Sequence, residues 1–258
     1  MLITVVAGLG SVLTLYSGFG LGTVLLPAFA TFLPVHIAVA ATAVVHCANN
    51  ALKCALLAKH ADRATLVRFG LPAVLAALAG AAVLASLTQL PVLATYSLAG
   101  HLATITPLKL AMAVLMAGFA GLELHPRFSA LQVDQRWLPL GGVLSGFFGG
   151  LSGHQGALRS AFLAKTGLST QAFVGTNAVI GMVVDVARLG VYVVGWKTTG
   201  GHFLRFNLLL TLACGIAAAF GGVLFGRQYL HKVTMRGVQR LTGALLLLMA
   251  LALGCGVL

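Results

Sequence analysis

The chain has 258 residues, of which 59% are hydrophobic and only 8% are charged, and its mean hydropathy is +1.02. A soluble globular protein needs many more charged residues on its surface, so this composition excludes that class and indicates an integral membrane protein. The net charge of +12 comes mostly from short linkers between apolar segments, where Lys and Arg set the orientation of a membrane protein. The lipid bilayer is therefore an expected partner, and no nucleic acid is expected.

Eight apolar segments follow one another along the chain, and each is far longer than the roughly 10 residues of a membrane-spanning β-strand. Hydrocarbon contains no water to satisfy backbone N–H and C=O groups, so segments of this length are expected to be helices. The predicted class is all-α, a polytopic membrane protein with a single transmembrane domain over residues 1–258. The segments cover residues 2–33, 36–58, 66–88, 107–124, 137–164, 170–194, 203–225 and 237–258.

The first and fifth segments differ from the others because glycines interrupt them. The first contains YSGFGLGT at residues 16–23, and the fifth contains FGGLSGHQG at residues 148–156. A flanking piece of about 15 residues would form roughly 22 Å of helix, which is short of the roughly 30 Å hydrocarbon core. Two interpretations are open for each segment, a re-entrant hairpin of two half-helices or one long bent helix.

The two breaks open two tandem repeats of four segments each. IAVAATAVV at residues 37–45 aligns with QAFVGTNAV at residues 171–179. We assign the first repeat to residues 1–124, a hydrophilic linker to residues 125–136 and the second repeat to residues 137–258.

The distribution of Lys and Arg favours inverted rather than parallel repeats. If the first and fifth segments re-enter, most of the positive charge lies on one side of the membrane, whereas two crossing segments would divide it almost equally. The positive-inside rule favours the uneven division, with both termini outside. The richer side would hold Lys59, Arg63, Arg68, Arg127, Arg136, Lys165, Arg227, Lys232, Arg236 and Arg240, and the poorer side Lys109, Lys197 and Arg205.

The tips of the broken segments are candidate binding sites. A helix that begins inside the membrane directs unpaired N–H groups and the positive end of its dipole into the protein, which favours an anion. Alternatively, the glycines serve close helix packing, which is common in membranes. Two similarly placed breaks, one of which carries a histidine and a glutamine, favour the binding site. The candidate residues are Gly18, Gly20, Gly22 and Thr23 in the first break and Ser152, Gly153, His154 and Gln155 in the second.

The second segment carries polar residues on one helical stripe. Steps of three and four residues place His46, Asn49 or Asn50, and Lys53 on the same face. A charge at membrane depth is costly and usually faces a cavity or a partner, so Lys53 is a candidate anion ligand together with Asn49 and Asn50. Alternatively, the Lys53 side chain extends to the nearby membrane interface.

The fifth and sixth segments contain the remaining candidate ligands. Arg159 could bind an oxyanion through two parallel hydrogen bonds, or it could bond the carbonyl groups at the end of a neighbouring helix. Arg188 could bind an anion, or it could form an i,i+3 ion pair with Asp185 that serves packing alone. Thr176 and Asn177 are further polar residues of the sixth segment.

Motifs of catalytic or metal sites are absent from the sequence. Neither HEXXH nor GXSXG occurs, His46 has no second ligand four residues later, and the four cysteines lack a paired metal-ligand spacing. We therefore expect no enzyme, no metal and no cofactor.

The repeats resemble a known family. Each opens with a glycine-rich break, SGFGLG or SGFFGGLSGHQG, and continues with a small-residue and threonine motif, AVAAT or FVGTN. In this they resemble the TauE/SafE sulfite exporter family, also called toluenesulfonate uptake permeases, over nearly the whole chain. The first break is less glycine-rich than in many members. The positions that match the family pattern are Gly18, Gly20, Gly22, Thr42, Gly149, Gly150, Gly153, Thr176 and Asn177.

The resemblance implies a multi-pass secondary transporter or facilitator in the cell inner (plasma) membrane. Its substrate would be sulfite, an organosulfonate or another small sulfur oxyanion, held near the midplane between the two broken segments. Asp185 is the candidate proton carrier if transport is coupled to protons. Thiosulfate or a carboxylate stays open as the anion, and a homodimer stays open as the assembly. An intramembrane enzyme and a non-transporting subunit are less favoured alternatives.

Overall fold

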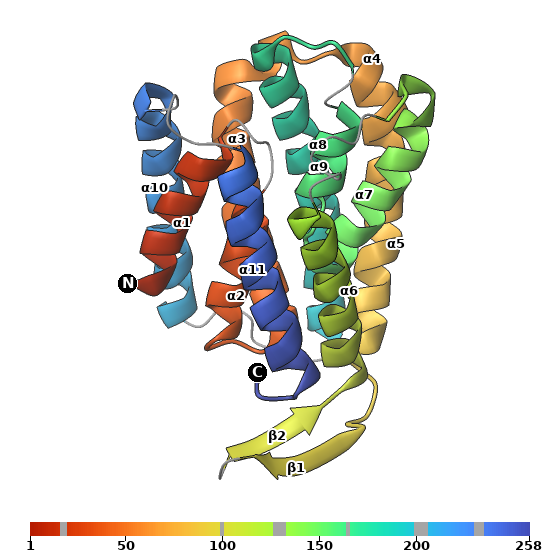
Figure 1. Cartoon of the computed structure of the whole chain (residues 1–258), viewed down its shortest axis with the longest axis vertical. Helices are drawn as coiled ribbons and strands as arrows, with labels where there is room; N and C mark the ends of the chain where they lie inside the picture. Colours follow the sequence, from red (N-terminus) through yellow and green to blue (C-terminus); the bar gives the residue numbers. More distant parts are fainter. Residues whose placement is uncertain (16–19, 99–100, 126–132, 164–165, 199–205, 230–234) are drawn as a thin grey trace.

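Helices make up nearly all of the fold (Figure 1). The computed structural model describes residues 1–15, 20–98, 101–125, 133–163, 166–198, 206–229 and 235–258. Within those ranges the only strands are the two of one short hairpin. The all-α class expected from the composition is therefore confirmed.

The first half of the chain contains a divided first segment and then three longer helices. Short helical pieces connect the second segment to the third. The elements are α1 (Leu2–Thr14), α2 (Leu21–Ala30), α3 (Val35–Leu57), η1 (Ala58–His60), α4 (Arg63–Thr65), η2 (Leu66–Gly70), α5 (Leu71–Leu87) and α6 (Pro107–Leu124).

The second half begins with another divided segment and continues with three long helices. These elements are η4 (Gln135–Trp137), α7 (Leu138–Ser152), α8 (Gly156–Leu163), α9 (Thr170–Thr198), α10 (Phe206–Tyr229) and α11 (Met235–Gly254). Among the described residues of the whole chain, five stretches are long and apolar enough to cross a membrane. They are Val35–His60, Arg63–Leu87, Pro107–Leu124, Thr170–Gly195 and Asn207–Gly226.

A β-hairpin, which was not predicted, connects α5 to α6. Strands β1 (Ala94–Leu98) and β2 (His101–Ile105) pair antiparallel. The hairpin lies at the same end of the molecule as the C-terminus, opposite α4 (Figure 1). The Tyr96 hydroxyl donates a hydrogen bond of 2.6 Å to the carbonyl of Cys255. The hairpin therefore packs on the C-terminal residues and stays outside the bundle.

Helices α5 and α7 pack closely and run in the same direction. Glycines spaced four residues apart on α7 meet backbone carbonyl groups of η2 and α5, and a Cβ at any of these glycines would overlap with the facing carbonyl group. This spacing of small residues is typical of close helix contacts in membranes. The glycines are Gly142, Gly146 and Gly150, which face Phe69, Ala73 and Ala77 in that order.

The fifth apolar segment folds as a hairpin of α7 and α8 whose tip lies inside the bundle. Gly150 faces Ala77, whereas α5 continues to Leu87, roughly 15 Å further at 1.5 Å per residue, so α7 ends inside the bundle. The Gln135 side chain before α7 donates a hydrogen bond of 3.3 Å to the carbonyl of Thr166, which follows α8. The two ends of the hairpin therefore lie together. The interruption is also narrower than the sequence indicated, because Gly149 and Gly150 lie within α7.

The first apolar segment is broken as well. Gly10 of α1 faces Leu21 and Val24 of α2, so the two helices lie against one another. Helix α2 begins at mid-depth, because Gly22 in its first turn faces His46, near the middle of α3. Gly18, one of the candidate site residues, lies outside the described residues.

Substitution of Gly146 by Ala is expected to destabilise the protein, because the new Cβ would overlap with the carbonyl of Ala73. Overpacking of this kind costs about 1–3 kcal/mol, which corresponds to a fall in Tm of roughly 3–10 °C. The matched control is Gly118→Ala on α6, where a Cβ meets nothing within 4 Å. Thermal unfolding in detergent measures both variants, and equal Tm changes would contradict the packing argument.

Candidate functional site

The two breaks meet in the interior of the bundle. A Cβ at Gly22, in the first turn of α2, would lie 3.4 Å from the carbonyl oxygen of Gly153 in the second break. Gly20 and Gly153 have positive φ angles of 107° and 84°, a conformation that other residues rarely adopt. Glycine is therefore required where α2 begins and where α7 ends.

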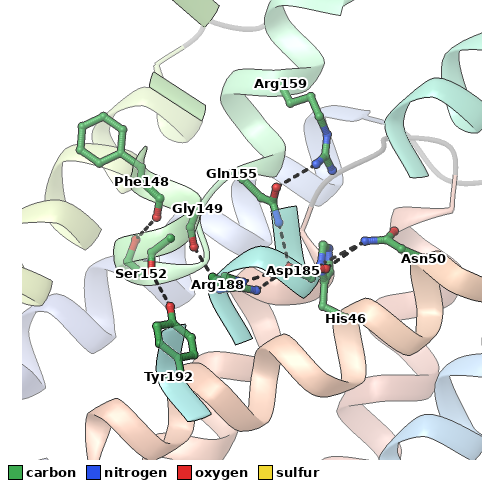
Figure 2. A network of polar contacts seen from close by, with 11 residues as sticks. His46, Asn50, Phe148, Gly149, Ser152, Gln155, Arg159, Asp185, Arg188 and Tyr192 are labelled. Atoms are coloured by element: carbon green, nitrogen blue, oxygen red, sulfur yellow. Dashed lines mark hydrogen bonds and ion pairs between the residues drawn. The ribbon is translucent and has the colours of Figure 1, made fainter. Parts of the chain in front are cut away.

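Asp185 of α9 is the centre of a buried polar network that links α3, the second break and α9 (Figure 2). Its Oδ1 accepts hydrogen bonds from Arg188 Nη2 at 2.8 Å, Arg188 Nε at 3.0 Å and Gln155 Nε2 at 3.0 Å. Its Oδ2 lies 2.6 Å from His46 Nδ1 and accepts a bond of 3.3 Å from Asn50 Nδ2. A carboxylate with this many donors is stabilised in its ionised form.

The carboxyl end of α7 is held by two side chains of α9. Arg188 Nη1 donates a hydrogen bond of 3.0 Å to the carbonyl of Gly149, and the Tyr192 hydroxyl donates to the carbonyl of Gly150. The last carbonyl groups of a helix lack partners within the helix, and the negative end of the helix dipole favours a cation there. Arg188 therefore stabilises the interrupted helix and pairs with Asp185 at the same time.

Arg159 of α8 is a second buried arginine, and it donates hydrogen bonds to two neutral side chains. Its Nε donates to Asn177 Oδ1 of α9, and its Nη1 donates a hydrogen bond of 3.0 Å to Gln155 Oε1. Gln155 therefore connects Arg159 to Asp185. The Arg159 guanidinium has no carboxylate among these partners, so its positive charge is only partly balanced.

Lys53 of α3 lies beside a small cavity of about 130 Å³. Within the ranges that the structure describes, its ammonium group has no hydrogen-bond or ion-pair partner. The cavity lies between the end of α3 and the start of α9, and it is lined by Leu15, Lys53, Leu56, Leu57, Thr170, Gln171, Val174 and Val223.

Three buried polar atoms near the breaks lack partners among the described residues. They are Thr42 Oγ1, Asn49 Nδ2 and His154 Nε2. The His154 ring stacks on Phe119 with ring centroids 5.5 Å apart, and its Nδ1 lies 3.0 Å from Ser152 Oγ. An unpaired buried polar atom costs free energy, so such atoms indicate a ligand or water.

The buried charges of α3, α8 and α9 do not balance. Lys53, Arg159 and Arg188 are at most 6% exposed, and Asp185 is the one carboxylate buried beside them in the described part of these helices. Glu123 is also buried, but it accepts a hydrogen bond of 2.7 Å from Thr242 between α6 and α11. An excess of buried positive charge is costly without a counterion, so this region favours an anion.

Cavities open at the opposite end of α3 and α9 as well. One has a volume of about 220 Å³ and is lined by the start of α3, the end of α5 and Tyr192 of α9. A neighbouring cavity of about 500 Å³ reaches the hairpin end at Thr106 and Lys109. The Asp185 network therefore lies between cavities at both ends of these helices.

The family model for the sulfite exporter TauE/SafE matches residues 2–253. The chain belongs to this family. No curated protein and no solved structure has significant similarity to the chain. Members of the TauE/SafE family are membrane transporters of sulfite or related anions, so membrane transport is the general function and the family is not one of enzymes.

The structure brings most of the sequence-predicted residues of this TauE/SafE protein together. Asn50, Gln155, Asp185 and Arg188 share one network, and Arg159 and Asn177 join it through Gln155. Gly20, Gly22, Thr23, Ser152, Gly153 and His154 lie at the two breaks. The predicted i,i+3 pair of Asp185 and Arg188 is confirmed.

Two predicted ligands have other partners. Thr176 lies near the end of the bundle, where its Oγ1 accepts a hydrogen bond of 2.9 Å from the backbone N–H of Asp62. The Asn49 side-chain oxygen accepts a bond of 2.7 Å from Ser11 of α1. The Asp62 carboxylate also caps α4, and its hydrogen bonds with Thr65 hold the pKa of that carboxyl below its usual range.

Sequence reasoning missed the contributions of His46 and Tyr192. The sequence pattern places His46 on the polar stripe without indicating a function for it, although its ring contacts Asp185 directly. Tyr192 follows Arg188 by four residues, so helical spacing could have placed both on one face. The carbonyl groups that Tyr192 and Arg188 bind belong to α7, and no sequence signal identifies that contact.

Replacement of Asp185 by Leu is expected to destabilise the protein, because Arg188 would remain as an uncompensated buried charge. Removal of one partner of a buried pair costs about 3–5 kcal/mol, whereas replacement of both partners by apolar residues is often neutral. The double variant Asp185→Leu with Arg188→Met should therefore recover most of the lost Tm in thermal unfolding. A double variant less stable than Asp185→Leu would contradict this account.

Proposed function

We propose that this TauE/SafE protein is a secondary transporter or facilitator of a small sulfur oxyanion, such as sulfite or an organosulfonate. The observation that carries the proposal is the excess of buried cations, Lys53, Arg159 and Arg188 against Asp185, next to two interrupted helices. Because Arg188 is engaged by Asp185 and the end of α7, Lys53 and Arg159 are the main candidate ligands.

The neutral part of the site suits an oxyanion. Helices α2 and α8 both begin inside the bundle, where their first N–H groups lack partners within the helix and favour negative charge. The unpaired Asn49 Nδ2 and His154 Nε2 are potential donors in the same region. Such groups replace the water molecules that an anion loses on leaving solution.

We infer that the two repeats are inverted. The corresponding helices α3 and α9 pack antiparallel: His46 contacts Asp185, and Leu57, later in α3, faces Gly175, earlier in α9. Antiparallel packing of equivalent helices is expected for inverted-topology repeats. The exposed Lys59, Arg63 and Arg136 at the α4 end then mark the cytoplasmic side of an inner-membrane protein.

The cavities suggest a route for the anion through the helix bundle. An anion that enters beside Lys53 at one end, or beside Tyr192 at the other, reaches the buried network from opposite sides of the membrane. Relative motion of the two repeats would open one cavity to the network while closing the other, which is the principle of alternating access. Substrate bound at the network would be carried in either direction according to its gradient.

Neutralisation of the proposed ligands tests the site. Lys53→Met and Arg159→Gln should each lower counterflow of ³⁵S-sulfite in proteoliposomes by roughly tenfold or more, because a hydrogen bond to a charged group contributes about 1.5–3 kcal/mol. The matched control is Lys59→Met, an exposed lysine just beyond α3, which should keep wild-type counterflow.

Equal losses in Lys53→Met and Lys59→Met would contradict the assigned site, and absence of counterflow in the wild type would contradict sulfite transport. Competition by unlabelled thiosulfate, an organosulfonate and acetate in the same assay ranks the alternative anions. Stronger competition by acetate than by the sulfur anions would favour a carboxylate substrate.

A further inference from the structure

We propose that His46 binds a proton that is transported together with the anion, an inference that rests on the proposed anion transport. His46 is 7% exposed and lies near the middle of α3, where α2, α9 and the second break come together. His46 Cδ2 and Thr42 Cγ2 both lie 3.9 Å from the Gly22 Cβ position, so the ring reaches the first turn of α2.

The two ring nitrogens of His46 have different surroundings. Nδ1 lies 2.6 Å from Asp185 Oδ2, and because this carboxylate is paired with Arg188, the nitrogen is the donor. Nε2 has no hydrogen-bond partner in the described ranges of the chain, and the ring edge that carries it together with Cδ2 faces α2. A proton can therefore be added at Nε2 without breaking the bond from Nδ1 to Asp185.

The surrounding charges make this protonation depend on an anion. Burial and the positive charges of Arg188 on α9 and Arg159 on α8 oppose the imidazolium form of His46, while the Asp185 carboxylate 2.6 Å away favours it. Helix α2 carries no titratable side chain, and α10 meets this part of α3 through Gly215 and Val45. An anion bound among the cations would shift the protonation equilibrium of His46 toward the imidazolium form. By linkage, protonation of His46 would strengthen anion binding.

The other buried acids are less suited to carry this proton. Protonation of Asp185 would remove the counterion of Arg188 and leave a buried charge without a partner. Glu123 is bonded to Thr242 between α6 and α11, away from the two breaks. His154 of the second break also has an unpaired Nε2, but its Nδ1 contacts the Ser152 hydroxyl instead of a carboxylate. His46 is therefore the histidine beside Asp185 that can change its charge while the Asp185–Arg188 pair stays intact.

The test uses the full chain in proteoliposomes with ³⁵S-sulfite as the probe. In the wild type, an inward-directed proton gradient should raise the initial rate of uptake roughly fivefold or more above the rate without a gradient. His46→Asn retains a donor for Asp185 but cannot be protonated, so it should lose the response to the gradient. Its sulfite counterflow should fall, because the linked proton no longer strengthens anion binding, but should stay above the rate in protein-free liposomes. The external pH is held constant and the internal pH is varied, so that external sulfite has the same ionisation in every sample. Protein-free liposomes measure its passive entry.

Two variants serve as controls. Glu123→Gln removes a buried carboxyl group away from the two breaks, and His60→Asn changes an exposed histidine just beyond α3. Both should keep the wild-type response to the proton gradient. Loss of the response in Glu123→Gln together with its retention in His46→Asn would assign the proton to Glu123 and overturn the proposal.

The remaining outcomes separate this inference from the proposed function. Wild-type counterflow without any effect of the gradient overturns the proton site alone, whereas a wild type without counterflow overturns sulfite transport itself. Complete loss of counterflow in His46→Asn also counts against the proposal, because the missing proton weakens anion binding but leaves in place the cations that hold the anion. His46→Gln repeats the test with a donor placed nearer to the position of Nε2.

Discussion

The ion pair of Asp185 and Arg188 is the interaction on which the centre of this TauE/SafE protein depends. Both residues are fully buried, and in a medium of low dielectric each charge needs the other. The pair also recruits Gln155, His46 and Asn50, so one carboxylate fixes the positions of α3, the second break and α9. In the described part of α3, α8 and α9, Asp185 is the one buried carboxylate beside three buried cations, so this arrangement leaves an excess of positive charge.

An interrupted helix is stable inside a membrane only if its ends find partners, because hydrocarbon supplies none. Arg188 and Tyr192 bind the carbonyl groups of Gly149 and Gly150 at the end of α7, while Ser145 bonds the carbonyl of Gln155 at the start of α8. The amino ends of α2 and α8 carry the opposite partial charge. Arg188 and Tyr192 thus satisfy the negative end of α7, and in the proposed function the positive ends of α2 and α8 face the anion.

The fold could be predicted largely from the length of apolar runs, which hydrocarbon thickness fixes. Helices α6 and α9 begin at the first residues of the predicted segments, and the glycines indicate the positions of both interruptions. The hairpin of β1 and β2 was missed because its short strands lie in a linker whose packing on the C-terminus is not encoded locally. His46 was given no role for a similar reason, since its partner Asp185 is 139 residues away.

The packing interpretation of the glycines holds in the body of α7, whereas the proposed binding site concerns the break that follows it. Gly142, Gly146 and Gly150 bring α7 into backbone contact with α5, and this contact fixes the depth at which α7 ends. Gly153, three residues later, turns the chain so that Gln155 reaches Asp185. The packing glycines therefore determine the position of the polar site. A substitution at one of them would shift the break along α5, so substrate binding and helix packing are expected to be coupled through α7.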